Sequence, residues 1–325
     1  MGIFFENVSD QDSNNNNINN EKINENENIN NNNNNLNKPY FRPKIIKLTK
    51  DEEKKPLTSN ELEIIFKEKF SKINFKTSNL KHLTQYYYNS ESINDFNWGC
   101  AWRSLQTVLS YLLSIEKREE DISFQNLFLK YGKRDVLLDF YLKAYNKKEI
   151  PNYLNIPFSP YENENGWAEP FISKLILFHF GFKGKLILIN NYPIHAYAPK
   201  EVFEEILIFE DFVNLLDEHF NHENSTPVII DDSIVSIIIA GIKKENDFIY
   251  FIILDPHIKI DEKGEKGVYF IKLNKNGYFN IEENPQTIIL KTLNFYKKPW
   301  MAFIPYNIYL VNFYLLFINK KIIFN

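Results

Sequence analysis

Beyond Gly181 the sequence is a series of short apolar runs separated by polar, glycine or proline residues, and this pattern limits the fold more than any other feature. Runs of this length and composition are typical of strands that are covered on both faces. The predicted strands are residues 185–189, 227–230, 234–240, 248–254, 267–271 and 300–305. The second half of the chain is therefore predicted to form a sheet, with a helix over residues 202–220 inserted between its strands.

The first half of the folded region is predicted to be mostly helical. Ser59 begins a short helical pattern, and Pro170 suits the first position of a later helix. The run Tyr86–Tyr88 instead indicates a half-buried strand. Helices first and sheet second give an α+β layout, and 44% apolar residues are enough to build its core.

The two ends of the chain depart from this globular pattern. Residues 14–37 contain 16 asparagines in 24 positions, which is too polar to bury a core, so residues 1–57 are predicted to be disordered. Residues 58–306 are predicted to be the folded domain. The tail 307–325 is apolar but carries about half of the ~20 residues that a membrane span needs. It is therefore predicted to be a buried final element, with an interfacial anchor as the alternative.

Charge and composition exclude several classes of function. A net charge of -4 without a long basic run argues against nucleic-acid partners. A single cysteine cannot form an internal disulfide, and the first residues lack a secretory signal, so a cytoplasmic location is expected. The glycines form no phosphate-binding loop, and five of the six histidines are not spaced as zinc ligands, so neither a metal nor another cofactor is expected.

The single cysteine, Cys100, stands directly before an apolar-periodic run that predicts a helix. A thiol in the first turn of a helix faces unpaired backbone N–H groups and the positive end of the helix dipole. Both features favour the thiolate, the nucleophilic form. A lone cysteine is more often a small buried apolar residue, so a second signal is needed.

That second signal is Asp255-Pro256-His257, which follows the predicted strand 248–254. In an extended chain, residues two apart project to the same side, so Asp255 and His257 would emerge together at the end of a strand. Asp255 could then orient the imidazole while His257 takes the proton of Cys100. Alone, this tripeptide would be an ordinary exit from a strand, but together the two signals predict a thiol hydrolase.

The segment Trp98-Gly99-Cys100-Ala101-Trp102-Arg103-Ser104-Leu105-Gln106-Thr107, with Leu254-Asp255-Pro256-His257 downstream, resembles the proteases specific for ubiquitin-fold modifier 1. The similarity extends over roughly residues 80–306. It implies a papain-like cysteine protease fold, in which a helical part packs on a central, mostly antiparallel sheet. The implied activity is to process the C-terminus of the modifier precursor and to remove the modifier from lysines of conjugated proteins.

The resemblance also implies roles for individual residues. Cys100 would be the nucleophile, His257 the general base and then acid, and Asp255 the residue that orients it. Tyr88, twelve residues before the cysteine, matches a tyrosine that contributes a hydroxyl to the oxyanion hole. Trp98 and Trp102 are candidate walls of the substrate channel, or else they pack the start of the helix. The implied partners are ubiquitin-fold modifier 1 and its conjugates, without nucleic acid or a transmembrane segment, and an adaptor at the endoplasmic reticulum is left open.

The sequence departs from the family pattern in several places. Asn97 and Trp102 replace a glycine and a tyrosine, and Trp167 and Glu169 occupy a region whose role stays open. The family tends to carry a glycine-rich, histidine-containing loop where this chain has Asp231–Ser236, which affects the expected shape of the substrate channel. The polar region before residue 58 matches the compact form, which has only the catalytic domain.

Two other functions compete with this prediction. One is the autophagy-related cysteine protease family, which uses Trp-Gly-Cys and Asp-Pro-His motifs on a related fold and acts on a ubiquitin-like modifier. Its cysteine motif continues differently, and no tyrosine at the spacing of Tyr88 is expected in it. The other is a catalytically inactive module that only binds the modifier. The joint presence of a cysteine, an aspartate, a histidine and this tyrosine argues against a pure binder.

Overall fold

The computed structural model describes residues 46–50, 53–71, 74–148, 150, 168, 170–190, 203–232, 234–257, 267–277 and 300–306. The asparagine-rich residues 14–37 and the tail 307–325 lie outside this description. Strand β1 (Ile46–Lys47) already pairs with β3 (Ile93–Asn94). Leu57 is buried and forms a bridge with Gln85. Ordered contacts with the domain therefore begin before residue 58, where the sequence had placed the start of the domain.

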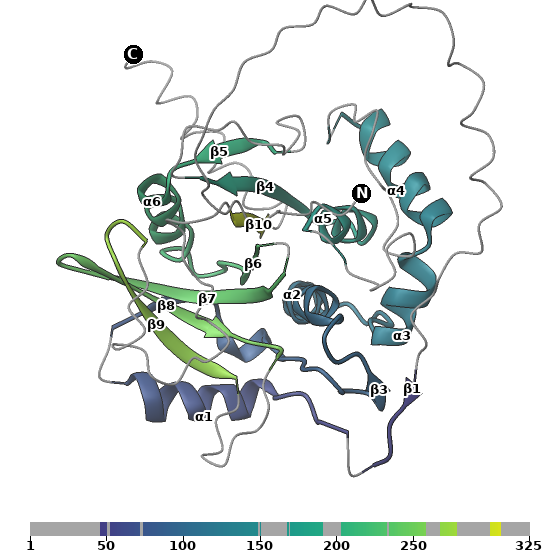
Figure 1. The fold of residues 1–325 in the computed structure, drawn as a ribbon, viewed down its shortest axis with the longest axis horizontal. Helices are drawn as coiled ribbons and strands as arrows, with labels where there is room; N and C mark the ends of the chain where they lie inside the picture. Colours follow the sequence, from purple (N-terminus) through teal and green to yellow (C-terminus); the bar gives the residue numbers. More distant parts are fainter. Residues whose placement is uncertain are drawn as a thin grey trace, which may run out of the picture.

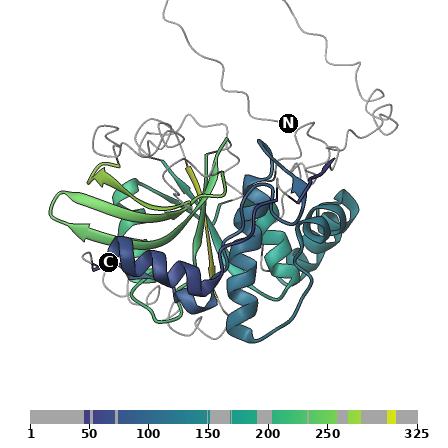
Figure 2. The same ribbon diagram turned by 90° about the horizontal axis from the view of Figure 1, so that it is seen from below.

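The helices that the structure describes lie mostly before the main sheet in sequence and on one side of it in space (Figures 1 and 2). They are α1 (Ser59–Phe70), η2 (Leu80–His82), α2 (Cys100–Glu116), α3 (Phe124–Asn126), η3 (Leu127–Tyr131), α4 (Arg134–Asn146), α5 (Pro170–His179) and α6 (Phe209–His219). The predicted helix starts are confirmed at Pro170 and, with Thr58 as its N-cap, at Ser59. None of the helices in the described ranges is long and apolar enough to cross a lipid bilayer.

Within the described residues, the main sheet has eight strands, of which seven follow the order β5-β4-β10-β6-β7-β8-β9 while β2 pairs with β7. Every pairing is antiparallel except that of β4 with β5. The strands are β2 (Lys76–Thr77), β4 (Lys183–Ile189), β5 (Glu205–Leu207), β6 (Val228–Asp231), β7 (Ser236–Glu245), β8 (Phe248–Leu254), β9 (Val268–Asn274) and β10 (Trp300–Tyr306). The predicted α+β class with a mostly antiparallel sheet is thus confirmed.

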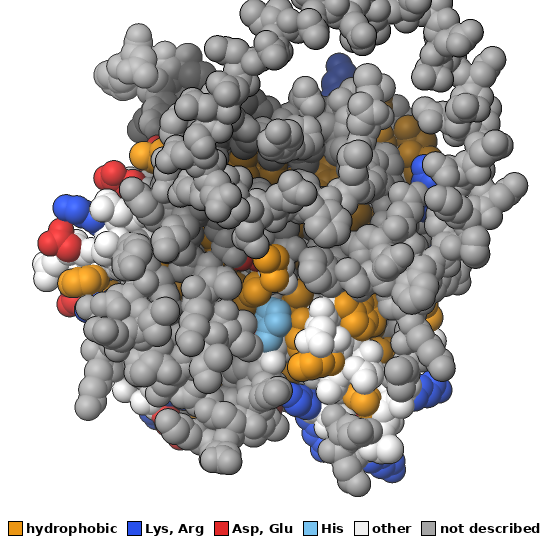
Figure 3. Space-filling model, viewed as in Figure 1, with side chains coloured by type: hydrophobic (Ala, Val, Ile, Leu, Met, Phe, Trp, Pro, Cys, Tyr) orange, Lys and Arg blue, Asp and Glu red, His pale blue; other side chains and the backbone are white. Residues whose placement is uncertain are grey.

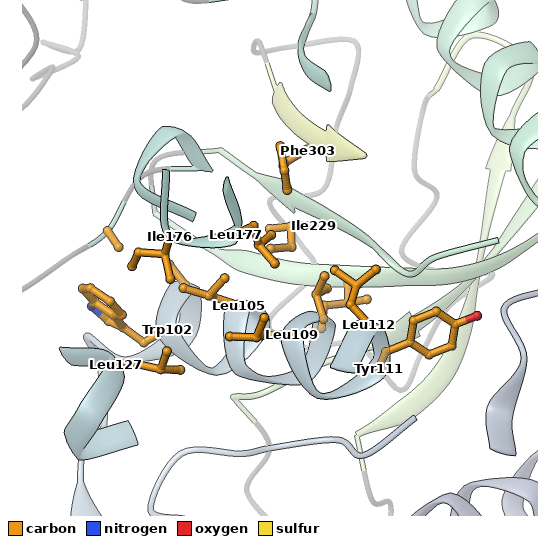
Figure 4. Close-up of a cluster of buried hydrophobic side chains, with 14 of the residues drawn as sticks. Trp102, Leu105, Leu109, Tyr111, Leu112, Leu127, Ile176, Leu177, Ile229 and Phe303 are labelled. Carbon is orange, nitrogen blue, oxygen red and sulfur yellow. The ribbon is translucent and has the colours of Figure 1, made fainter. Parts of the chain in front are cut away.

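The sheet is buried on both faces because alternate residues of each strand enter different cores. On one face, residues such as Ile229 and Phe303 join the core built around α2, where Leu105, Leu109 and Leu112 are also buried (Figure 4). On the other face, the alternate strand residues pack against the apolar side of α6. This arrangement seats α2 firmly against the sheet, and α2 is the helix that begins at Cys100.

Two predicted elements were wrong. The predicted helix 202–220 contains strand β5 and only then α6, because residues 205–207 extend the sheet beside β4. The tyrosine run forms no strand. Tyr87 and Tyr88 are buried, but their backbone N–H groups bond to the Ser90 side chain and to the Pro256 carbonyl instead of a ladder. Burial of the rings was read correctly from the sequence, whereas the backbone conformation follows from contacts with distant segments.

Candidate active site

Helix α2 begins at Cys100, as the sequence predicted, and the residue before it allows a close approach of another segment. Gly99 is the N-cap and supplies no capping side chain. A Cβ atom at Gly99 would lie 2.1 Å from the Asp95 carboxylate, so only glycine lets this carboxylate reach the helix start. Cys100 itself is 8% exposed. The thiol is therefore held at the positive end of a buried helix.

Asp255 and His257 meet at the end of β8, but by a different geometry from the predicted one. The chain turns at Pro256 and His257 instead of continuing extended. The Asp255 Oδ1 atom accepts hydrogen bonds from the His257 backbone N–H at 2.8 Å and from the ring Nδ1 at 2.7 Å. A turn closed by an aspartate side chain thus aligns the pair. Because a carboxylate only accepts, the proton sits on Nδ1 and the Nε2 atom is left for another partner.

The two motifs, far apart in sequence, converge on Cys100. The Cys100 thiol is within hydrogen-bonding reach of both the His257 ring and the Tyr88 hydroxyl. The Tyr88 and His257 rings pack edge to face with centroids 5.1 Å apart. The Tyr88 backbone N–H donates to the Pro256 carbonyl at 3.0 Å. Cys100, His257, Asp255 and Tyr88 therefore form one cluster.

Charge and burial tune these groups in opposite directions. Burial lowers the pKa of His257, but the hydrogen bonds and charges of Asp255 and Cys100 outweigh it and raise this pKa to about 10. Burial alone would raise the pKa of Asp255, yet His257 and a hydrogen bond from Tyr269 hold it below its usual value. The pKa of Tyr88 is raised mainly by burial and secondly by the neighbouring Cys100. The Tyr88 hydroxyl therefore stays protonated and can donate a hydrogen bond. The cluster combines an imidazolium, a carboxylate and a hydrogen-bond donor around one sulfur atom.

The loop that carries Tyr88 contains four non-glycine residues in the left-handed region: Asn89, Glu91, Ser92 and Asn97, with φ between 57° and 71°. Such residues are strained unless the surroundings stabilise them. The buried Arg103 of α2 supplies much of this support. It donates to Asp95 at 2.8 Å, to Glu91 at 3.0 Å and to the Ser90 carbonyl at 2.8 Å. One guanidinium thus fixes the loop of Tyr88 against the helix of Cys100.

The two tryptophans of the cysteine motif differ in position. Trp102 was predicted as a wall of the substrate channel, but it is fully buried and packs against Phe128 and Gly132. Figure 4 shows it in the apolar cluster beside Leu127 and Ile176. Of the two roles predicted for Trp102, the structure fits packing at the start of the helix, because a side chain that faces the core cannot reach a channel. Trp98 is half-buried against Phe124 and Phe128 and keeps some accessible surface.

An aromatic residue beside the cluster was missed by the sequence reading. Phe96 is 42% exposed, and its ring lies 5.7 Å from that of Tyr88. Its only sequence signal is its position in the loop before the cysteine. Figure 3 shows a face of the molecule on which a histidine side chain lies among hydrophobic side chains. Phe96 therefore gives the cluster an accessible apolar neighbour.

The altered loop Asp231–Ser236 lies at the same edge of the sheet as Asp255. Asp231 pairs with Ser236, and Ile238 of the following strand pairs with Leu254. Asp232 closes this loop by accepting hydrogen bonds from the N–H groups of Ile234 and Val235. The departure from the family pattern therefore falls at the edge that holds the catalytic candidates. Trp167 and Glu169 lie outside the described residues.

This arrangement suits covalent chemistry at sulfur. A thiol with an imidazole beside it, a carboxylate behind the ring and a hydroxyl donor nearby has the parts that acyl transfer requires. Among the residues that the structure describes, no group of three or more His, Cys, Asp or Glu side chains could hold a metal ion.

Comparisons with known proteins bear on the same segment. Residues 76–130 match the sequence model of peptidase family C78, and this range includes Tyr88 and Cys100. Among solved structures, UfSP from C. elegans is similar with a TM-score of 0.46 and 14% sequence identity, over 75% of this chain and 36% of that one. This chain thus spans about a third of the length of UfSP. No curated protein matches the sequence.

Replacing Arg103 tests whether the loop depends on its guanidinium. We expect Arg103→Met to lower the free energy of unfolding by about 3–5 kcal/mol, because it leaves the Asp95 carboxylate buried without its cation. The matched control is Arg118→Met, which removes two partly exposed ion pairs of about 0–1 kcal/mol each. Urea unfolding followed by circular dichroism measures both. Equal losses in the two variants would contradict the assigned role of Arg103.

The raised pKa of His257 predicts a dependence of stability on pH. Folded His257 keeps its proton where the unfolded chain has lost it, so its contribution is complete below about pH 6.5 and is lost as pH rises through the folded pKa. Cys100→Ala is the right background, since the thiol can no longer exchange a proton with the ring. There, the free energy of unfolding should fall by up to about 1.4 kcal/mol per pH unit above pH 6.5.

The control for this measurement is Cys100→Ala combined with His257→Gln, which lacks the titrating ring. Its free energy of unfolding should change less steeply over the same pH range. Two parallel curves would show that the His257 pKa is not raised by its surroundings.

Proposed function

We propose that this chain, as a member of peptidase family C78, is a thiol protease that cleaves after the C-terminal glycine of ubiquitin-fold modifier 1. It would process the precursor of the modifier and also cut the isopeptide bond to a lysine of a target protein. The match of residues 76–130 to the family supports the peptidase class. The substrate and the two reactions follow from the resemblance of the cysteine and Asp-Pro-His motifs to the modifier-specific proteases.

One observation carries the proposal: Cys100 interacts with both His257 and Tyr88, while Asp255 is bonded to the far side of the imidazole. A buried structural cysteine has no need of these partners. A protein that only binds a modifier has no need of them either, since binding requires no proton transfer.

In the first step, the Cys100 sulfur attacks the carbonyl carbon of the scissile bond. The proton of the thiol is held on His257 Nε2 while Nδ1 donates to Asp255, so the ring is the imidazolium that its raised pKa favours. A carbon–sulfur bond forms, and the carbonyl π electrons move onto the oxygen. Tyr88 can donate its hydroxyl to this developing oxyanion, together with N–H groups of the first turn of α2.

In the second step, the tetrahedral intermediate collapses. The bond from carbon to nitrogen breaks, and His257 gives its proton to the leaving amine, which is a peptide α-amine or a lysine ε-amine. A thioester between Cys100 and the modifier remains. Water then attacks the thioester with His257 as base, and the thiol is regenerated with release of the free C-terminal carboxylate.

The test uses the modifier with a short peptide extension after its terminal glycine and, separately, the modifier joined to a lysine side chain. We expect both to be cleaved after the glycine. Cys100→Ala should abolish cleavage while it leaves modifier binding within about twofold, since it removes only the nucleophile. Mass spectrometry identifies the products, and calorimetry measures binding.

A parallel assay with a ubiquitin-like autophagy modifier separates the closest alternative. Faster cleavage of that substrate would move the chain to the autophagy-related class. A modifier that carries a C-terminal electrophile decides between an enzyme and a binder. Because the chain has one cysteine, a covalent adduct reports on Cys100 alone, and binding without an adduct would leave only a binding module.

Tyr88→Phe tests the oxyanion donor. We expect kcat to fall by roughly 100-fold with KM nearly unchanged, because the hydroxyl acts on charge that develops in the transition state. Tyr86→Phe is the matched control, since Tyr86 lies two residues before Tyr88 in the same run but is only partly buried. The kcat of this variant should stay near the wild-type value. Unchanged turnover in Tyr88→Phe would remove Tyr88 from the oxyanion hole.

A further inference from the structure

The Asp255 carboxylate has a second side-chain partner that the sequence did not reveal. The Tyr269 hydroxyl donates to Asp255 Oδ2 at 2.6 Å. The other oxygen, Oδ1, is taken by the backbone N–H and the ring Nδ1 of His257. Asp255 is 1% exposed, so bulk water does not solvate Oδ2. Tyr269 and His257 thus bond to opposite oxygens of one buried carboxylate.

The strand register explains why Tyr269 reaches this position. Ile253 pairs with Tyr269 in the antiparallel ladder of β8 and β9, and the Asp255 N–H donates to the Gly267 carbonyl at 2.9 Å. Asp255 therefore lies opposite Gly267, and Tyr269 is its diagonal neighbour on the same face of the sheet. At this spacing a long aromatic side chain spans the gap to a shorter one.

The segment around Asp255 leaves little room for adjustment. Gly267 has φ +70°, and a Cβ atom there would lie 2.7 Å from the Asp255 carbonyl and 2.9 Å from the Tyr87 ring. The Gln85 side chain donates to the carbonyls of both Asp255 and Gly267. The backbone of Asp255 is thus fixed from three sides. The remaining freedom is rotation of the carboxylate, and the Tyr269 hydroxyl restricts it.

We propose that Tyr269 is a positioning residue that holds the Asp255 carboxylate with Oδ1 aimed at the His257 ring. Without the hydroxyl, Oδ2 loses its side-chain donor while it stays buried, and the carboxylate is stabilised by rotating toward another donor or by taking up a proton. Either change weakens the bond to Nδ1. The His257 ring is then held less firmly beside Cys100, and the sulfur reacts more slowly with an electrophile.

The alternative is that Tyr269 only packs the sheet, since it also belongs to the apolar core on the α6 side. The two roles differ in one respect. A packing residue acts the same whether or not Asp255 is charged, whereas a positioning residue acts only through the carboxylate.

The experiment compares four full-length proteins: wild type, Tyr269→Phe, Asp255→Asn and the double variant. The readout is the rate of alkylation by iodoacetamide at pH 7, which reports only on Cys100 because the chain has one cysteine. We expect Tyr269→Phe to slow alkylation roughly 3- to 10-fold, the range that a typical single hydrogen bond supports. Asp255→Asn should slow it at least as much, and the double variant no further.

Tyr111→Phe is the matched control. The Tyr111 hydroxyl is also buried and donates at 2.7 Å, but to the Ser225 carbonyl and away from the start of α2 (Figure 4). Its alkylation rate should equal that of the wild type. The proposal is overturned if Tyr269→Phe leaves the rate unchanged, or if it slows the wild type and Asp255→Asn by the same factor.

Alkylation needs no protein substrate, so the result is independent of the proposed function. The same four proteins are then assayed on the modifier precursor, where kcat should follow the alkylation pattern and KM should stay within about twofold. Non-additive effects of Tyr269→Phe and Asp255→Asn on alkylation, without any cleavage of the precursor, would support the role of Tyr269 and contradict the proposed protease function. Cleavage of the precursor with independent effects of the Tyr269 and Asp255 substitutions would support the protease function and contradict the positioning role of Tyr269.

Discussion

The burial of one carboxylate, that of Asp255, is the constraint on which the candidate site depends. A buried charge is costly unless hydrogen bonds and an opposite charge compensate it. Asp255 meets this condition through the His257 backbone, the His257 ring and the Tyr269 hydroxyl. Because each donor has a fixed origin in the turn after β8 or in β9, the hydrogen bonds that satisfy the charge also fix the position of the imidazole. The same hydrogen bonds therefore stabilise the buried Asp255 carboxylate and align the His257 imidazole.

A second buried acid lies on the helix side of the cluster, and its different partner gives it a different role. Asp95 is paired with the guanidinium of Arg103, and arginine side chains serve as fixed cations in proteins. Burial raises the pKa of Asp95 and Arg103 opposes that rise. The pair therefore supports the loop of Tyr88 without taking part in proton transfer. Asp255 is paired with His257, whose imidazole can exchange a proton. Proton transfer is therefore assigned to the Asp255–His257 pair at the end of β8.

The parts of the fold set by local pattern were predictable, and those set by distant contacts were not. The apolar run 248–254 gave β8 with the bounds that the structure has, and the helix at Cys100 was placed correctly. The tyrosine run was misread because its backbone bonds go to Ser90 and Pro256, which no local propensity encodes. Of the two roles predicted for Trp102, the channel wall does not fit the structure, for a related reason. Its motif neighbours suggested a site residue, but its helix position faces the core.

Tyr269 was invisible in the sequence because its role depends on strand register. An aromatic residue in a strand is normally a packing residue, and a shift of β9 by one residue would turn this side chain to the opposite face. Gly267 and Gln85 limit such a shift by bonding to or packing against the Asp255 backbone. Tyr269, which the sequence would assign to the core, thus reaches Asp255 because of the pairing of β9 with β8.

The start of α2 also contributes to the site, because its N-terminus has no side-chain cap. A side-chain cap at a helix N-terminus contributes about 1 kcal/mol, and Gly99 supplies none. The start of the helix therefore carries no capping side chain, and its positive end can face a negative charge such as an oxyanion formed next to Cys100. A capping side chain would compete with such a charge, and any Cβ at this position would collide with Asp95. The missing cap is offset by Arg103, which lies one turn inside α2 and bonds to the preceding loop. The helix is therefore anchored by a side chain beyond its first turn, so no capping side chain covers the N-terminus beside Cys100.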